Sequence, residues 1–191
     1  MPGPKPLPIF VLAEQFRYAG ALAIEIPRLA NVLQIPQLGE ARALYLPTAY
    51  MVNNAFALEL YFKCLIRIGR KPYGKEHDLR KLFGLIGRRS QANIKRYWRE
   101  RAAEHAQISL EKIYSDSGEP VPKVDFTFCL NISRDAFTTM RYLYEGVRPD
   151  KGWAGDGIVE SARQVILDKY PHWIRMRQVA PSPHFVYNPH S

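Results

Sequence analysis

Two pairs of chemically active side chains flank one short loop. Glu59 and Lys63 lie four residues apart in the apolar segment "FALELYFKCLIRI" (56–68), and His77 and Asp78 follow the loop "GRKPYG". On a helix, an acid placed four residues before a base forms an ion pair on one face. Inside an apolar helix, the same charges are costly to desolvate unless further partners satisfy them. We therefore expect Glu59 and Lys63 to belong either to a buried polar clamp or to a polar cleft between helices that binds phosphate or a base.

His77 can act in two ways. Its imidazole can bond a backbone group or a carboxylate at the mouth of the loop, which is the interpretation that we adopt. Alternatively, it can contact phosphate or transfer protons, which makes it a candidate catalytic residue. We expect Asp78 to cap the next helix, because its carboxylate can accept hydrogen bonds from the free amides at the positive helix end.

Positive charge is concentrated next to these pairs. The net charge of the chain is +9, and residues 67–101 contain twelve Lys or Arg but three acids. This segment therefore has an excess of positive charge equal to that of the whole chain. Within it, Lys95, Arg96, Arg99 and Arg101 are interleaved with aromatic residues, which predicts a basic face that contacts RNA phosphates. The alternative is a solvated face that keeps the protein soluble.

The elements that position these residues are helices. Their apolar spacing predicts an all-α bundle of five to six helices, in which the segment 40–68 is apolar nearly all round and therefore central. The six predicted helices are 9–26 (ending at Pro27), 40–68 (with Pro47 as start or kink), 79–86, 91–113 (capped by Ser90), 132–146 and 157–169, and a short helical piece lies around 28–34. Phe126, Phe128 and Leu130 alternate as in a brief extended segment.

Length and composition set the bounds of the protein. With 191 residues and 47% hydrophobic content, the chain suits one domain, which we place at residues 1–175, followed by a Pro-rich tail over 176–191. We expect no transmembrane helix and no signal peptide, and hence a cytoplasmic protein. Cys64 and Cys129 stand alone, so the sequence predicts no disulfide framework, no metal site and no cofactor.

Three segments together resemble a known family. The segment "AFALELYFKCLI" followed by "HDLRKLF", and later "DAFTTMRYLYE", resembles the HEPN domain (higher eukaryotes and prokaryotes nucleotide-binding), in the prokaryotic branch whose late helix carries an Arg-Tyr pair. The order, spacing and helical placement of the segments agree over about residues 45–168.

This resemblance implies a HEPN-like helical bundle, often a homodimer, of a kind found among RNases, toxin–antitoxin partners, defence systems and RNA-binding proteins. It places the "RYLYE" helix beside the central one, which would make Arg141 the third member of the clamp with Glu59 and Lys63. It also makes Tyr142 and Glu145 candidates for a ligand site, with Tyr142 stacking on or bonding an RNA base.

Catalytic members of the family carry an Arg and a His on a late helix with four to six residues between them, and this chain departs from that pattern. No His lies within six residues after Arg141. Two formal matches occur elsewhere: Arg70 and His77 flank the Gly/Pro loop on the wrong side of the fold, and Arg99 and His105 would be about 240° apart around a helix. Arg101 and His105, four positions apart, would share a helix face but miss the spacing. His77 and Arg141 are thus the remaining candidates for catalysis.

We expect a HEPN-like protein that binds RNA or nucleotide-bearing partners in a defence or stress system, toxin–antitoxin-like, and that is not a conventional RNase. One alternative is a dimeric helical module for protein–protein interaction. The other is a metal-independent endoribonuclease with a noncanonical Arg/His pair.

Overall fold

The fold consists of helices throughout the part of the chain that the structure describes. The computed structural model describes residues 5–32, 42–114, 120–137 and 153–178, and no strand occurs in these ranges. The helices are α1 (Pro6–Val32), α2 (Arg42–Ile68), α3 (Leu79–Leu85), α4 (Arg88–Arg101), α5 (Ala103–Tyr114), α6 (Phe126–Ile132), α8 (Asp156–Lys169) and the 3-10 helix η3 (Pro171–Gln178). The prediction of an all-α bundle is confirmed.

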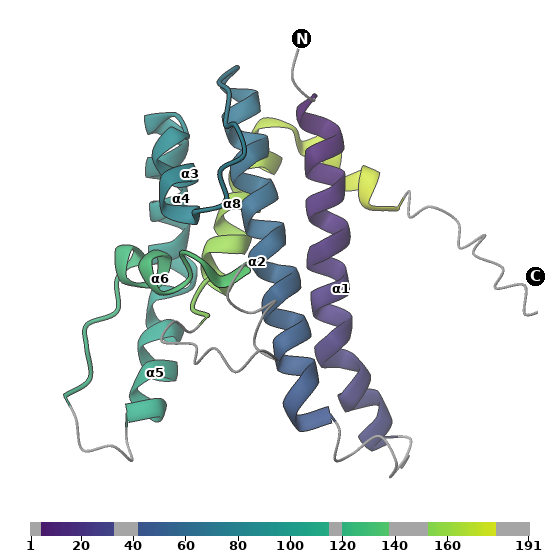
Figure 1. Ribbon diagram of the computed structural model, residues 1–191, viewed down its shortest axis with the longest axis vertical. Helices are drawn as coiled ribbons and strands as arrows, with labels where there is room; N and C mark the ends of the chain where they lie inside the picture. Colours follow the sequence, from purple (N-terminus) through teal and green to yellow (C-terminus); the bar gives the residue numbers. More distant parts are fainter. Residues whose placement is uncertain (1–4, 33–41, 115–119, 138–152, 179–191) are drawn as a thin grey trace, which may run out of the picture.

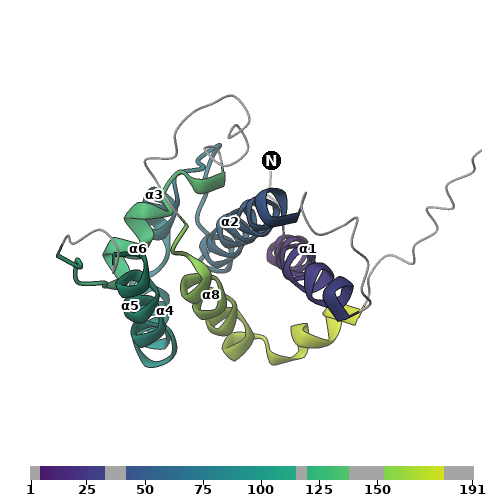
Figure 2. The same cartoon turned by 90° about the horizontal axis from the view of Figure 1, so that it is seen from below.

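The central element is α2, as its composition predicted. Every residue from Ala57 to Ile66 is buried. The helices α1 and α2 run antiparallel side by side, α8 packs against α2 and is bonded to α1, and α4 packs against α8 (Figures 1 and 2). A helix that is apolar all round needs neighbours on all sides, and this arrangement supplies them.

The first helix is longer than its prolines suggested. Instead of two pieces separated at Pro27, α1 continues to Val32, so the predicted end at Pro27 was wrong. A proline disfavours the helix locally, but tertiary packing overrides local preference, and α1 lies along α2. Likewise α2 begins at Arg42, so that Pro47 does not start it.

The segment expected to be one helix over 91–113 forms two. Gly87, not Ser90, is the N-cap residue, so α4 begins at Arg88. The helix ends at Arg101, the backbone of its C-cap residue Ala102 departs from helical angles (φ −130°, ψ −20°), and α5 begins at Ala103. The basic segment is therefore divided between two helices.

The residues predicted to be extended are instead the short helix α6. Asp125 caps it by accepting a hydrogen bond from the Phe128 amide at 2.7 Å. The apolar spacing also fits a helix, because Phe126, Cys129 and Leu130 share one buried face at i, i+3 and i+4. The prediction of an extended segment was wrong because only the alternating residues were compared.

Some predictions fall outside the described residues. The expected helix over 132–146 extends past residue 137, and most of the tail over 176–191 lies beyond residue 178. The helices that the structure does describe include none long and apolar enough to cross a membrane.

Candidate functional site

The carboxylate of Glu59 is the centre of a polar cluster inside the bundle. Its side chain is wholly buried on α2, and Oε1 accepts a hydrogen bond from Lys63 Nζ at 2.6 Å. The Nδ1 of His77 lies 3.0 Å from the same oxygen. Lys63 also lies over the ring of Tyr73, 5.3 Å from its centroid. The acid and base of the central helix are therefore paired with each other and joined by the histidine that follows the loop.

The loop that carries His77 is fixed by its neighbours. Asp78 caps α3 by accepting from the Lys81 amide at 3.0 Å, as predicted, and also pairs with Arg134 Nε at 2.9 Å. The carboxylate of Glu76 accepts hydrogen bonds from the amides of Asp78 and His77, each at 3.0 Å. The bond from the Asp78 amide is the main reason that the pKa of Glu76 is lowered. These contacts hold the imidazole against α2.

The geometry leaves one nitrogen of His77 available. With a proton on Nδ1, the imidazole donates to Glu59, and Nε2 is then the nitrogen that can accept a proton or bond a ligand. The side chain is 55% exposed although the carboxylate beneath it is not. In addition, Glu59 Oε2 has no hydrogen-bond partner in the part of the chain that the structure describes. A buried carboxylate that orients an exposed imidazole is suited to proton transfer or to contact with a phosphate.

A basic face on α4 is the second candidate feature. It consists of five exposed residues: Arg88, Arg89, Lys95, Arg96 and Arg99. At about 100° per residue these five lie within an arc of about 120°, on the side of α4 away from its buried Ile94 and Trp98. The face contains one acid at its edge, Glu100, which pairs with Arg96 at 3.3 Å.

The α4 basic face differs in membership from the predicted one. Arg88 and Arg89 were missed, because Ser90 was taken as the cap and the two arginines fell before the helix. The cue that could have included them is Gly87, a residue common at helix ends. Arg101 lies about 120° beyond either edge of the face: its guanidinium is 4.9 Å from the Tyr97 ring centroid, and Nη1 donates to Gln164 of α8 at 3.4 Å.

The remaining predicted site residues are Lys95 on α4, the pair Arg101 and His105, and three residues of the expected late helix. Lys95 is exposed, and its ammonium lies 5.8 Å from the ring centroids of both Phe83 and Phe126. The break at Ala102 places Arg101 and His105 on different helices. Arg141, Tyr142 and Glu145 lie outside the described residues.

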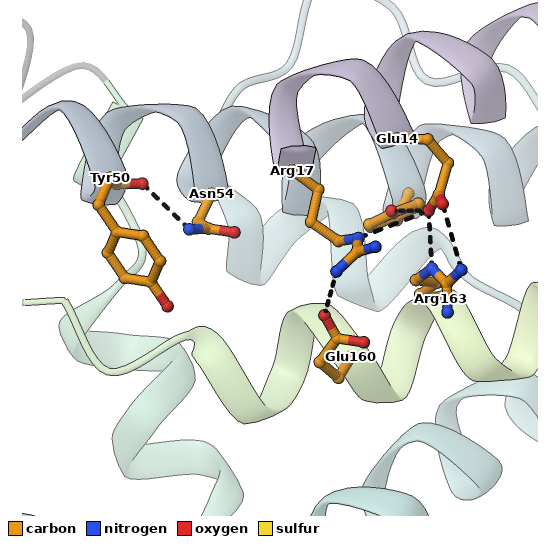
Figure 3. Close-up of polar contacts among 7 residues, drawn as sticks. Glu14, Arg17, Tyr50, Asn54, Glu160 and Arg163 are labelled. Carbon is orange, nitrogen blue, oxygen red and sulfur yellow. Dashed lines mark hydrogen bonds and ion pairs between the residues drawn. The ribbon is translucent and has the colours of Figure 1, made fainter. Parts of the chain in front are cut away.

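A third polar cluster, which sequence reasoning missed, joins three helices (Figure 3). Glu14 of α1 accepts from Arg163 of α8 at 2.8 and 3.2 Å and from the hydroxyl of Tyr61 on α2. Arg17 lies 3.7 Å from Glu14 and donates to Glu160 at 3.0 Å. Burial, with Glu14 next in effect, raises the pKa of Tyr61 well above its usual range. Both carboxylate oxygens of the buried Glu14 accept hydrogen bonds from Arg163, so we assign this cluster to the fold.

No known protein family, curated protein or solved structure matches this chain.

Two side-chain amides of α2 and the two thiols of the described chain are also held inside the bundle. Asn53 and Asn54 donate to the carbonyls of Ala49 and Tyr50, one turn earlier, at 2.8 and 3.1 Å.

Cys64 and Cys129 are buried and free, and burial raises their pKa to about 12 and about 11. These thiols are therefore poor nucleophiles at neutral pH. Within the described ranges, no group of three His, Cys, Asp or Glu is placed to hold a metal ion.

Proposed function

We propose that this chain is a HEPN-like protein that binds RNA through the α4 basic face. The observation that carries the proposal is the five exposed cations within one arc of α4, with Glu100 as the acid at its edge. Such a stripe attracts a polyanion and releases its counterions, which makes binding depend on salt. The phosphate backbone of RNA is the natural ligand for charges that are arranged along a helix.

The family resemblance supports the proposal from a different direction. Two of the segments that carry it meet in the structure, because Lys63 from the first and His77 from the second share the carboxylate of Glu59. We extend the proposal from this resemblance to a homodimer that acts in a defence or stress system of the toxin–antitoxin kind.

A salt titration with labelled single-stranded RNA tests RNA binding. The variant Arg88→Ala/Lys95→Ala/Arg99→Ala removes three cations of the face without removing a described hydrogen bond. For a single strand, the slope of log K against log salt is about 0.7 per phosphate contacted, so three lost contacts reduce the slope by about 2. The triple variant should also bind RNA more weakly than the wild-type protein at low salt.

A matched variant removes the same charge elsewhere. Lys123, Lys169 and Arg175 are exposed and lie outside α4. Replacing all three with alanine should therefore leave most of the RNA affinity and the slope of log K against log salt unchanged. If both triple variants weaken binding equally, net charge rather than the α4 basic face attracts the RNA. If the wild-type protein binds no RNA at low salt, the RNA proposal fails and the protein-interaction module becomes the better interpretation.

The oriented imidazole of His77 favours a second candidate function, metal-independent cleavage of RNA. In that reaction Nε2 takes the proton of a ribose 2′-hydroxyl, and the 2′-oxygen attacks the adjacent phosphorus. The bond to the 5′-oxygen breaks, and that oxygen takes a proton from water, leaving a 2′,3′-cyclic phosphate and a 5′-hydroxyl. Glu59 holds the imidazole in the tautomer that this step requires.

Incubation of RNA in EDTA tests this second function. His77→Ala should abolish cleavage while leaving RNA affinity within about twofold of wild type, because His77 is not part of the α4 basic face. Cleavage that persists in His77→Ala, or that requires a divalent ion, excludes this mechanism.

A further inference from the structure

Ala92 lies at the centre of the α4 basic face and is exposed. Each of the five cations is three, four or seven positions from it, so all five surround it on one side of the helix. At about 100° per residue, three of them lie on one flank of Ala92 and two on the other: Arg88, Lys95 and Arg99 form the first row, and Arg89 and Arg96 form the second. The face therefore presents two rows of long cationic side chains with a small residue between them.

The aromatic rings of α4 are not available to stack on a base. Trp98 is 4% exposed. The ring centroid of Tyr97 lies 4.3 Å from the guanidinium carbon of Arg96 and 4.9 Å from that of Arg101. The Tyr97 hydroxyl donates to a carboxylate of α8 at 2.5 Å. Both rings therefore belong to the packing of α4 rather than to its ligand-facing side.

The neutral polar side chains of α4 also lie outside the basic face. Gln91 uses its side-chain NH2 group on three backbone carbonyls at 2.8 to 3.3 Å, where it joins α4 to α3 and its C-cap. Asn93 and Ser90 are half-buried, and they lie about 40° and about 100° beyond the edge of the arc at Arg89. The surface around Ala92 thus offers charges for phosphates but no amide, hydroxyl or ring to read a base.

A surface of this kind suits an RNA double helix better than a single strand. Proteins that hold single strands combine cations with exposed aromatic rings on which the bases stack. In an RNA duplex the bases already stack on one another, and proteins bind it largely through phosphates and 2′-hydroxyls across a wide, shallow minor groove. Building on the RNA binding proposed above, we infer that the α4 basic face binds double-helical RNA across this groove, with one row of cations on each strand and Ala92 over the groove.

The position of α4 in the bundle favours a shallow groove. Its inner side packs on α8 and carries the buried Ile94 and Trp98. In Figures 1 and 2, α4 and α5 lie on the side of the molecule away from α1. A helix held in this way presents one broad side and cannot be enclosed by a deep groove, as a recognition helix is in the major groove of DNA. The duplex that matches the face is therefore RNA rather than DNA.

Fluorescence anisotropy with matched nucleic acids tests the form of the ligand. The probes are an RNA duplex of about 20 base pairs, each of its strands alone, the DNA duplex of the same sequence, and an RNA duplex of unrelated sequence. At about 0.1 M salt the RNA duplex should bind at least about tenfold more tightly than either strand or the DNA duplex. The two RNA duplexes should agree within about twofold, because phosphate contacts carry no sequence information.

A carboxylate at the centre of the face tests the surface. In Ala92→Glu the new side chain lies four positions from both Arg88 and Arg96, so it pairs with a cation of each row. At about 0.1 M salt each lost phosphate contact lowers duplex affinity by about tenfold, and we expect at least that loss. Ala21→Glu makes the same charge change at an exposed alanine of α1 and should leave the affinity within about twofold. The urea midpoint of Ala92→Glu should not fall below that of wild type, because its new ion pairs support the helix.

Each outcome decides for or against this ligand. Tighter binding of the RNA duplex that is lost in Ala92→Glu and kept in Ala21→Glu supports it. If no RNA of either form binds, the RNA binding proposed above fails as well. If a single strand or the DNA duplex binds as tightly as the RNA duplex, or if Ala92→Glu binds like wild type, RNA binding stands and the double-helical ligand is overturned. A difference of more than about tenfold between the two RNA duplexes would mean that bases are read, and also overturns it.

Discussion

The strongest energetic prediction concerns the ion pair inside α2. Lys63→Met removes the cation that lies 2.6 Å from Glu59, and methionine keeps the length and apolar character of the side chain. The carboxylate left behind is 1% exposed and cannot reach water, so it loses its main counter-charge without gaining solvation. Removing one partner of a buried ion pair costs about 3–5 kcal/mol. We expect about 3 kcal/mol, the lower end, because the Nδ1 of His77 still contacts the carboxylate.

The double variant distinguishes this explanation from loss of packing. Glu59→Leu/Lys63→Met replaces both charges with apolar groups of similar size, and such replacements are often neutral. We expect the double variant to be within about 1 kcal/mol of wild type in its free energy of unfolding, although Lys63→Met alone is not. The single variant Glu59→Leu should cost less than Lys63→Met, because the lysine side chain is 11% exposed and can move toward solvent.

Urea unfolding followed by circular dichroism measures these differences. With a slope of about 1–3 kcal/mol per molar urea, a loss of about 3 kcal/mol moves the midpoint by about 1–3 M. The dependence of the unfolding free energy on urea concentration should be the same in all variants. The reasoning is refuted if the double variant is as unstable as the sum of the two single variants, because the two charges would then contribute independently.

Three further predictions use other contacts. Gly157→Ala would place a methyl group 2.3 Å from the Cβ of Ala102, so α4 and α8 must separate, and we expect a loss of about 1–3 kcal/mol in thermal or urea unfolding. Tyr61→Phe removes a buried hydroxyl that donates to a carboxylate, at a cost of about 1.5–3 kcal/mol in the same assay. Cys64 and Cys129, with pKa values of about 12 and about 11, should react slowly with iodoacetamide in the folded protein at pH 9, where an ordinary exposed thiol is largely ionised, and rapidly once urea unfolds it.

The controls for these variants lie in the same chain. Gly84→Ala adds a methyl group to α3 where nothing lies within 4 Å, and it should stabilise the protein by up to about 1 kcal/mol. If Gly157→Ala is equally well tolerated, the close approach of α4 and α8 is not a constraint. Rapid alkylation of folded protein at pH 9 would mean that Cys64 or Cys129 is accessible.

Local chemistry is what the sequence predicted best. The burial of α2 follows from its apolar composition, and the cap at Asp78 follows from one side chain and the amides next to it. His77 was expected to bond a backbone group or a carboxylate, and it lies against the carboxylate of Glu59 across one short loop. These features depend on residues close together in the chain, where spacing alone is informative.

Features that depend on distant residues were missed. Glu14 and Arg163 are separated by 149 positions, and nothing in their neighbourhoods indicates that they pair. The same limit explains α1, where packing on α2 overrides the stop signal of Pro27. At α4 the error was local: choosing Ser90 over Gly87 moved the helix start and removed two arginines from the candidate site.

The cluster at Glu14 also has a consequence for the order of folding during synthesis. Its carboxylate is buried between α1 and α2, but the arginine that bonds both of its oxygens belongs to α8, near the end of the described chain. Until residue 163 has left the ribosome, the α1–α2 pair must either bury Glu14 with only Arg17 and the Tyr61 hydroxyl as partners or keep its carboxylate in water. The N-terminal hairpin should therefore stay loose on the ribosome and become stable late, when α8 arrives. Nascent chains that end before α8 should remain sensitive to protease, although they already contain α2, the central helix of the described bundle.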